Sequence, residues 1–228
     1  MQEEIKKHGK KIFTIAAESN AGITRKMKEI LLEIFIIFIA VSISVWFHNY
    51  NEKRHQDAEV KEFLIDLKDD LLKDKTTYQR HVGFFNEDSQ LYQKILSINK
   101  SNIDTMNIKI MFNVRTLSLS CGNYEGFKTS GKIGYIKNKK LKKLLLGYYE
   151  NEVKSLTFAQ DYYMQQSSAL FSSIFDKTTN TDEYLCSKKV KWMARANLGI
   201  ASSVKEELNY DIKLIDQLLK EIAKDTAE

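Results

Sequence analysis

The longest uninterrupted apolar run lies near the start of the chain. Residues 30–47 read ILLEIFIIFIAVSISVWF, and Glu33 is the single charged residue among them. A helix needs about 20 mostly apolar residues to cross a bilayer, and about 17 suffice. An isolated segment inside hydrocarbon satisfies its own backbone hydrogen bonds only as a helix. The pattern predicts an uncleaved transmembrane helix over 30–48, and it leaves open the alternative of a buried core helix.

Three polar or aromatic residues mark the two ends of this run. Trp46 and Tyr50 lie where interfacial aromatic residues flank a membrane span. Glu33 lies about one turn inside the run, where an ionisable side chain is costly and often functional. Snorkelling, or pairing with Arg25 or Lys26 of a neighbour, accounts for Glu33; a role in helix association or proton movement is the alternative.

The basic residues around the run favour one orientation. Seven lysines and arginines precede it and three follow closely, so we expect the N-terminus in the cytoplasm and residues 51–228 outside it. Residues 1–29 then form a basic cytoplasmic leader. Its segment 4–15 is either a solvated tail, which its thin apolar face favours, or an amphipathic helix on anionic headgroups.

A seven-residue repeat of large apolar side chains follows the span. It predicts a long membrane-proximal helix over 51–98, either single or split into two collinear pieces. The companion positions of the repeat turn polar at Asp74, His81 and Asp88, which weakens a sustained coiled coil. The repeat consists of Leu64, Leu71, Tyr78, Phe85 and Tyr92.

The remainder, 106–228, reads as further helices and no strand pair. The sequence contains no proline, which favours long unbroken helices. We therefore predict an all-α fold, in which a transmembrane helix continues into a long helix and then into an antiparallel bundle. The expected helices are about 106–118, 124–130, 138–176 and 187–223, the last with an interruption near 197–199, and the expected loops are 99–105 and 177–183.

Three stretches together resemble a domain-of-unknown-function family of bacterial single-span membrane proteins. They are Lys28–Ile34 entering the span, His48–Arg54 leaving it, and Tyr124–Ile133 with its continuation Tyr135–Asn138 and Leu141. The match covers roughly residues 20–155, and Gly126 departs from the bulky aliphatic residue usual there. The resemblance implies an inner-membrane anchor with an exported, periplasmic helical domain, and it implies no activity.

Several motifs invite a chemical interpretation that their context does not support. The segment 126–133 nearly matches a phosphate-binding loop, but Ile133 replaces the Ser/Thr that holds Mg²⁺ and no strand precedes it. A capping turn is the better interpretation, with Gly131 at positive φ and Asn138 capping the next helix. The four histidines do not cluster, so we expect no metal, no cofactor and no catalytic constellation.

Five lysines lie close together after this turn, and two cysteines lie further apart. The lysines read as a solvated helix face, or as a contact for acidic lipid or an acidic partner; nucleic acid is not an expected partner outside the cytoplasm. Cys121 and Cys186 either pair in an oxidising compartment or stay as two unpaired core thiols. The lysines are Lys137, Lys139, Lys140, Lys142 and Lys143.

These patterns predict a non-catalytic, single-pass membrane protein that acts as an interaction or scaffold protein or a complex subunit. Its expected partners are the lipid bilayer and either a second copy, bound through 55–95, or another membrane or periplasmic protein. The alternative is a sensor whose bundle binds a ligand and signals through the span. A closed, partly polar cavity would favour the sensor, and an exposed apolar patch would favour the interaction protein.

Overall fold

The computed structural model describes residues 2–17, 23–101, 116–175 and 181–227, and every regular element in these ranges is a helix. The all-α prediction is therefore confirmed. The chain divides into two compact units, Met1–Glu59 and Val60–Glu228. We call the first the N-terminal unit and the second the bundle, and we describe each separately.

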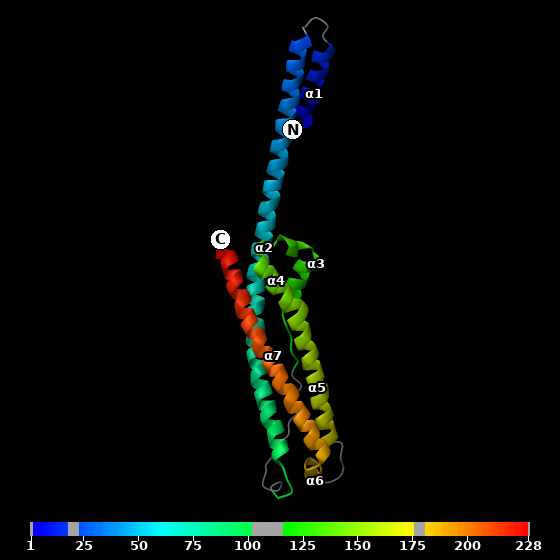
Figure 1. Ribbon diagram of the computed structural model, residues 1–228, viewed down its shortest axis with the longest axis vertical. Coiled ribbons are helices and arrows are strands. Elements are labelled where there is room, and N and C mark those ends of the chain that lie inside the picture. Colours follow the sequence, from blue (N-terminus) through cyan, green and yellow to red (C-terminus); the bar gives the residue numbers. More distant parts are fainter. Residues whose placement is uncertain (1, 18–22, 102–115, 176–180, 228) are drawn as a thin grey trace. The chain divides into compact units, whose positions relative to one another are not determined.

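The N-terminal unit is a helical hairpin. Helix α1 (Gln2–Ala17) runs back along the first part of helix α2 (Ile23–Ser97), as Figure 1 shows. Helix α2 contains no proline and a single glycine, so nothing in its sequence forces a break. The predicted span and the predicted long helix are thus one continuous helix, which belongs to both units.

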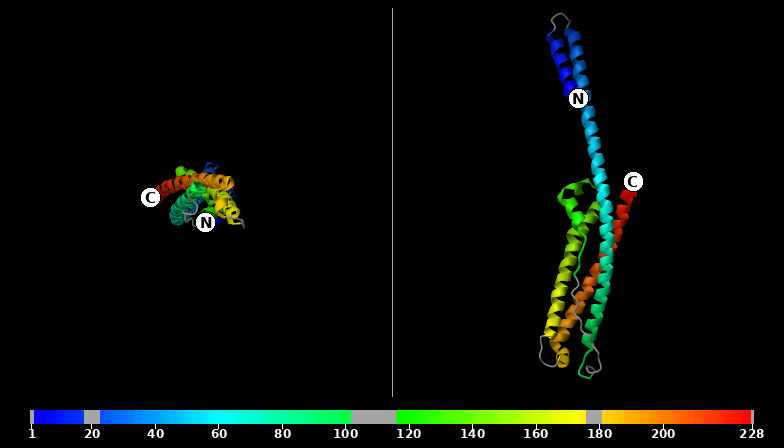
Figure 2. Two further views of the ribbon diagram at one scale, coloured as in Figure 1. Left: turned by 90° about the horizontal axis from the view of Figure 1, so that it is seen from below. Right: turned by 180° about the vertical axis from the view of Figure 1, so that it is seen from behind.

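Three long helices make up most of the bundle (Figures 1 and 2): α2 from Val60 onward, α5 (Val153–Phe175) and α7 (Lys188–Ala227). Tyr78 meets Tyr148 and Tyr92 meets Tyr163, a constant offset that shows α2 and the chain entering α5 to be parallel. Helix α7 runs antiparallel to both of them. Its Lys191 caps the C-terminal end of α2, donating to the carbonyl oxygens of Ile95, Leu96 and Ile98 at 2.5, 2.9 and 2.6 Å.

Short elements connect the long helices at the ends of the bundle. At one end lie α3 (Gly122–Thr129), a 3₁₀ turn (Lys132–Tyr135), α4 (Lys139–Gly147) and a π-helical turn (Tyr148–Glu152) that leads into α5. At the other end lies α6 (Thr181–Leu185). The expected helix 138–176 therefore exists, but the π turn divides it.

The capping interpretation of 126–138 is confirmed in detail. Gly131 has φ 76°, a left-handed conformation that glycine adopts without steric cost, and it separates α3 from the 3₁₀ turn. The Asn138 side chain accepts hydrogen bonds from the backbone N–H groups of Lys140 and Leu141, both at 3.0 Å. These bonds satisfy two of the free donors at the start of α4.

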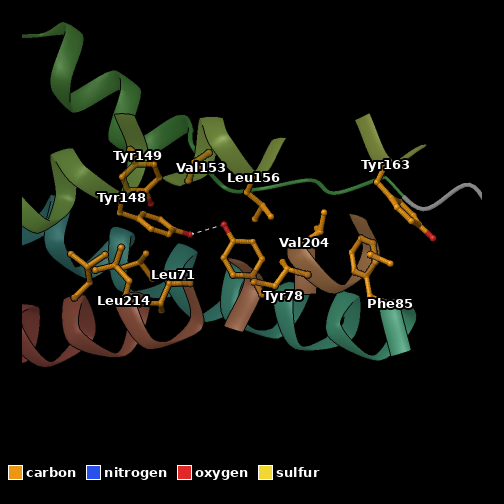
Figure 3. Close-up of a cluster of buried hydrophobic side chains, with 14 of the residues drawn as sticks. Leu71, Tyr78, Phe85, Tyr148, Tyr149, Val153, Leu156, Tyr163, Val204 and Leu214 are labelled. Atoms are coloured by element: carbon orange, nitrogen blue, oxygen red, sulfur yellow. Dashed lines mark hydrogen bonds between the residues drawn. The ribbon is translucent and has the colours of Figure 1, made fainter. Parts of the chain in front are cut away.

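The seven-residue stripe of α2 forms the core of the bundle. Leu64, Leu71, Tyr78 and Tyr92 are at most 1% exposed, and Figure 3 shows several members of the stripe beside side chains of α5 and α7. The stripe is therefore not free to contact a second copy, and self-association through 55–95 remains a prediction. The stripe packs within its own bundle because two further helices of the same chain cover it.

Other predicted boundaries need correction. The expected helix 106–118 lies largely outside the described residues, and its last residues, 116–118, have no regular structure. Helix α7 continues unbroken through 197–199, where the buried Asn197 amide donates to the carbonyl oxygens of Gln166 and Met193. The expected loop 177–183 is partly outside the described residues, and from Thr181 onward it is helix α6.

Candidate membrane and interaction surfaces

The apolar run of α2 is almost entirely bare. From Ile34 to Phe47 its large apolar side chains are 37–67% exposed, apart from Ile37, which is partly buried. Among the described residues, α2 is the one helix long and apolar enough to cross a membrane, and only 6% of its most apolar 18-residue window is buried. A core helix of a soluble protein would be mostly buried there. The apolar segment of α2 thus lacks the protein cover that an aqueous solvent would require.

Aromatic side chains mark one end of this bare segment. The rings of Trp46 and Tyr50 stack with centroids 5.8 Å apart and an interplanar angle of 16°. Their side chains are 64% and 50% exposed. One face of the helix therefore presents two amphipathic rings where the apolar run ends, an arrangement suited to a lipid–water interface.

Glu33, at the other end, is held by two side chains of α1, His8 and Lys11. Its carboxylate lies 2.5 Å from His8 Nδ1 and 2.7 Å from Lys11 Nζ, and its side chain is 3% exposed. Pairing was expected for Glu33, but with Arg25 or Lys26, whose side chains lie outside the described residues. The sequence pattern gave no signal for His8, because the contact depends on α1 folding back along α2.

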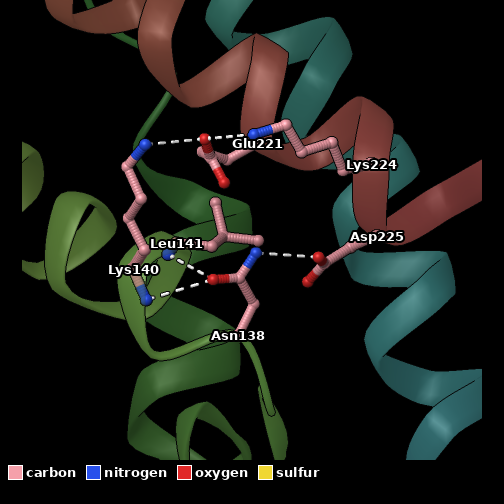
Figure 4. Close-up of polar contacts among 6 residues, drawn as sticks. All are labelled: Asn138, Lys140, Leu141, Glu221, Lys224 and Asp225. Atoms are coloured by element: carbon pink, nitrogen blue, oxygen red, sulfur yellow. Dashed lines mark hydrogen bonds and ion pairs between the residues drawn. The ribbon is translucent and has the colours of Figure 1, made fainter.

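Two of the five clustered lysines, Lys140 and Lys142, make structural contacts, and Figure 4 shows those of Lys140. Lys140 pairs with Glu221 of α7 at 2.9 Å, and Lys224 pairs with the same carboxylate at 2.8 Å. These two ammonium groups hold the pKa of Glu221 at about 2, below its usual range. Lys142 donates to the Gly134 carbonyl oxygen at 3.0 Å, and the remaining three, Lys137, Lys139 and Lys143, are exposed. Lys140 therefore ties α4 to the C-terminal part of α7, while three of the other lysines are exposed to solvent.

The two cysteines do not pair. Both are free thiols, Cys121 just before α3 and Cys186 just after α6, at opposite ends of the bundle (Figure 1). Burial, with nearby Asp74, raises the pKa of the Cys121 thiol above its ordinary value. The structure thus has the second of the two expected alternatives, and Cys121 is a protonated, half-buried thiol rather than a reactive thiolate.

Tyrosine hydroxyls form hydrogen bonds inside the core, which sequence reasoning missed. Tyr78 and Tyr148 meet at 3.1 Å (Figure 3). Tyr92 contacts both Tyr163, at 2.9 Å, and Ser167, at 2.8 Å. Burial raises the pKa of Tyr78 and Tyr163, so the phenols stay neutral. The presence of Tyr78 and Tyr92 in the seven-residue repeat was the available signal, but it gives no information on which hydroxyls meet.

Asp211 of α7 is the most unusual buried group. Its side chain is fully buried, and neither carboxylate oxygen has a hydrogen-bond partner among the described residues. Burial, assisted by the nearby carboxylates of Glu152 and Glu207, raises the pKa of Asp211 to about 7. Because the group lies inside the core with a raised pKa, its protonation affects the stability of the bundle.

An open groove runs along α5 and α7 and has a volume of about 460 Å³. Its lining includes the small residues Ala196 and Gly199, and it includes Phe158 and Tyr162, which are 74% and 45% exposed. Trp192, on the same stripe of α7 one turn away, is 72% exposed. The full lining is Phe158, Ala159, Tyr162, Ala196, Gly199, Ile200, Ser203, Val204 and Glu207.

Comparisons with protein-family models, with curated proteins and with solved structures find no match to this chain. The family resemblance described above therefore rests on its three quoted stretches alone. Among the described residues, no group of three or more His, Cys, Asp or Glu side chains is placed to hold a metal ion.

Proposed function

We propose that this protein is a non-catalytic, single-pass membrane protein whose bundle is an interaction module. The observation that carries the proposal is the bare apolar segment of α2, with 6% of its most apolar window buried. Each large apolar side chain left in water forgoes about 1.5–3 kcal/mol of transfer free energy. A bilayer removes that cost for the whole segment at once, since every backbone hydrogen bond is already made within the helix.

The proposed topology places the N-terminus in the cytoplasm and residues 51–228 in the periplasm, with the span in a bacterial inner membrane. The excess of lysine and arginine before the span supports this orientation. The family resemblance supports the compartment. Trp46 and Tyr50 then lie at the periplasmic interface.

A second copy of the chain is the partner we propose for the α5–α7 groove. Small residues are part of the groove's lining, and the same two helices carry the exposed rings of Phe158 and Trp192. A two-fold pair brings the same patch together twice, so the rings of one copy meet the small residues of the other. The groove is open and mostly apolar, which supports an interaction protein over a ligand-binding sensor.

Membrane association is tested by alkaline carbonate extraction of the full chain from cells. We expect the chain to stay in the pellet, and a variant with Phe35, Phe38 and Ile43 replaced by serine to move to the supernatant. In the matched control variant, serine replaces the exposed Phe158 and Tyr162 of the bundle, and this variant should stay in the pellet. A wild-type chain that is extracted without detergent would overturn the proposal.

Orientation is tested by placing a single cysteine at the exposed Ser101 in a C121S/C186S background. A thiol reagent that crosses the outer but not the inner membrane should label it in intact cells. Labelling only after cell lysis would show that position 101 is cytoplasmic and that the topology is the opposite of the one proposed.

Self-association through the groove is tested by sedimentation velocity in detergent. Ser203 lines the groove, so Ser203→Trp should fill it and shift the protein to monomer mass. Glu206 is exposed and is not part of the lining, so Glu206→Trp should leave the dimer intact. A wild-type chain that sediments as a monomer at all concentrations would exclude the second copy. Cross-linking from position 203 in membranes to a different protein would identify another partner instead.

A further inference from the structure

The hairpin of the N-terminal unit and the proposed span use the same length of α2. Helices α1 and α2 are antiparallel, and His8 contacts Glu33. Both helices advance about 1.5 Å per residue. Gln2 precedes His8 by six residues, so in this antiparallel pair it lies level with the residue six positions after Glu33, about residue 39 of α2. Helix α1 therefore accompanies α2 through about half of residues 30–47.

This register leaves too little helix to cross a bilayer. Beyond the reach of α1, the apolar run continues only from residue 40 to 47, eight residues that extend about 12 Å. The hydrocarbon core is about 30 Å thick. The run can span it only if the part that lies beside α1 also enters the hydrocarbon.

Helix α1 cannot accompany α2 into the hydrocarbon at low cost. Lys6 and Lys7 are level with about residues 34–35 of α2, and Lys10 with about residue 31, by the same register. All three side chains are exposed, so insertion of the intact hairpin would carry their charges into lipid. The closed hairpin and a fully inserted span thus exclude one another.

We propose that α1 is an exchangeable helix with two binding places. Before insertion it pairs with Glu33; when 30–48 cross the bilayer it leaves α2 and lies on a surface of anionic phospholipid. This inference rests on the proposed membrane function. It goes further because it gives α1 a defined lipid partner and makes insertion depend on breaking the cluster of His8, Lys11 and Glu33.

The chemistry of α1 fits an anionic headgroup layer. Lys6, Lys7, Lys10 and Lys11 are exposed, and each basic side chain near an anionic surface adds to the attraction. Phe13, 81% exposed, offers an apolar side chain to the boundary between headgroups and acyl chains. After release, Glu33 remains about one turn from the interface, within reach of the headgroup region.

A reversible cross-link tests whether the hairpin must open. The full chain with H8C/E33C in a C121S/C186S background is made by cell-free synthesis and closed with a bis-maleimide whose spacer contains a reducible disulfide. Vesicles of phosphatidylcholine and phosphatidylglycerol are added, and carbonate-resistant chain is measured before and after reduction. The E33C single variant, treated with the same reagent, controls for the lost carboxylate.

We expect the cross-linked chain to be extractable and the reduced chain to become resistant. Equal resistance of both would overturn the exchange while leaving the membrane proposal standing. A wild-type chain that never becomes resistant would instead overturn the membrane proposal, and the exchange with it.

The lipid partner is tested in the inserted chain with an environment-sensitive fluorophore on F13C in the same cysteine-free background. Its emission should shift to the blue in vesicles containing phosphatidylglycerol and stay unshifted in phosphatidylcholine alone. The K6E/K7E/K10E variant should lose the shift. Identical emission in both kinds of vesicle would overturn the anionic-surface part of the proposal.

Discussion

Helix α2 places similar residues in opposite surroundings in the two units. Phe38, in the N-terminal unit, is 67% exposed, whereas Phe85, in the bundle, is 3% exposed. In the bundle, by contrast, polar groups such as Asp74 and the Tyr78 hydroxyl are buried. The difference teaches that residue type alone does not decide burial along a helix. In the bundle other helices of the chain cover α2, whereas over 34–47 most of its large apolar side chains stay exposed.

The buried polar groups of the bundle tolerate burial because most of them have partners. Asp74 accepts a hydrogen bond from the Ser120 backbone N–H at 2.9 Å, and the core tyrosines bond to one another. A buried polar group without a partner costs about 1–3 kcal/mol. Among the described residues, Asp211 and the Tyr149 hydroxyl are exceptions, and burial raises the pKa of the Asp211 carboxyl.

The largest expected effect comes from truncating equivalent leucines in the two units. Leu71→Ala removes a fully buried side chain and should lower the free energy of unfolding of the bundle by about 2–5 kcal/mol. Leu31→Ala, at a side chain 60% exposed, should change it by less than about 0.5 kcal/mol. Urea unfolding in detergent, followed by circular dichroism, measures both. Equal losses would erase the contrast between the units.

A charge placed in the bare segment should have the next largest effect, on insertion rather than folding. Phe38→Arg should disfavour insertion by about 2.5–3.5 kcal/mol, since that is the cost of arginine near the centre of a span. Phe158→Arg, at an equally exposed phenylalanine of the bundle, should insert like the wild type. A cell-free insertion assay compares the two, and equal insertion would contradict the distinction.

The unpartnered Asp211 should make the stability of the bundle fall as pH rises. Its pKa is raised from 3.8 to about 7, so the folded state binds the proton more tightly than the unfolded state. The stabilisation is complete below pH 3.8, the pKa of Asp211 in the unfolded state. It is lost as the pH rises from 3.8 to about 7, by at most about 1.4 kcal/mol per pH unit. Asp211→Asn should flatten this part of the curve. An unchanged slope in urea unfolding across that window would show that Asp211 is not buried as described.

The smallest effect should come from the tyrosine pair, and it should be non-additive. Tyr78→Phe leaves the Tyr148 hydroxyl buried without the partner it has at 3.1 Å, and should cost about 1–3 kcal/mol. The double variant Y78F/Y148F removes both hydroxyls and should cost less than the single variant. A double-mutant cycle measures the coupling. Additive losses would mean that the two hydroxyls do not bond.

The sequence by itself determined the helical architecture and the local turn and helix cap at Gly131 and Asn138. A chain without proline favoured long helices, and hydropathy located the bare segment at 30–47. Gly131 and Asn138 act where the sequence predicts, because a positive φ and a helix N-cap are properties of one residue and its immediate neighbours. Such local preferences are readable without knowledge of distant parts of the chain.

Only the tertiary structure decided which distant residues meet. It turned the seven-residue stripe of α2 into the core of its own bundle, gave Glu33 its partners His8 and Lys11, and left the two cysteines apart. An apolar stripe is equally suited to a second copy or to helices of the same chain, and a carboxylate to any nearby cation. Which partner is contacted depends on the direction in which each helix runs back along the preceding one. That direction is fixed by packing over the whole fold rather than by a local pattern.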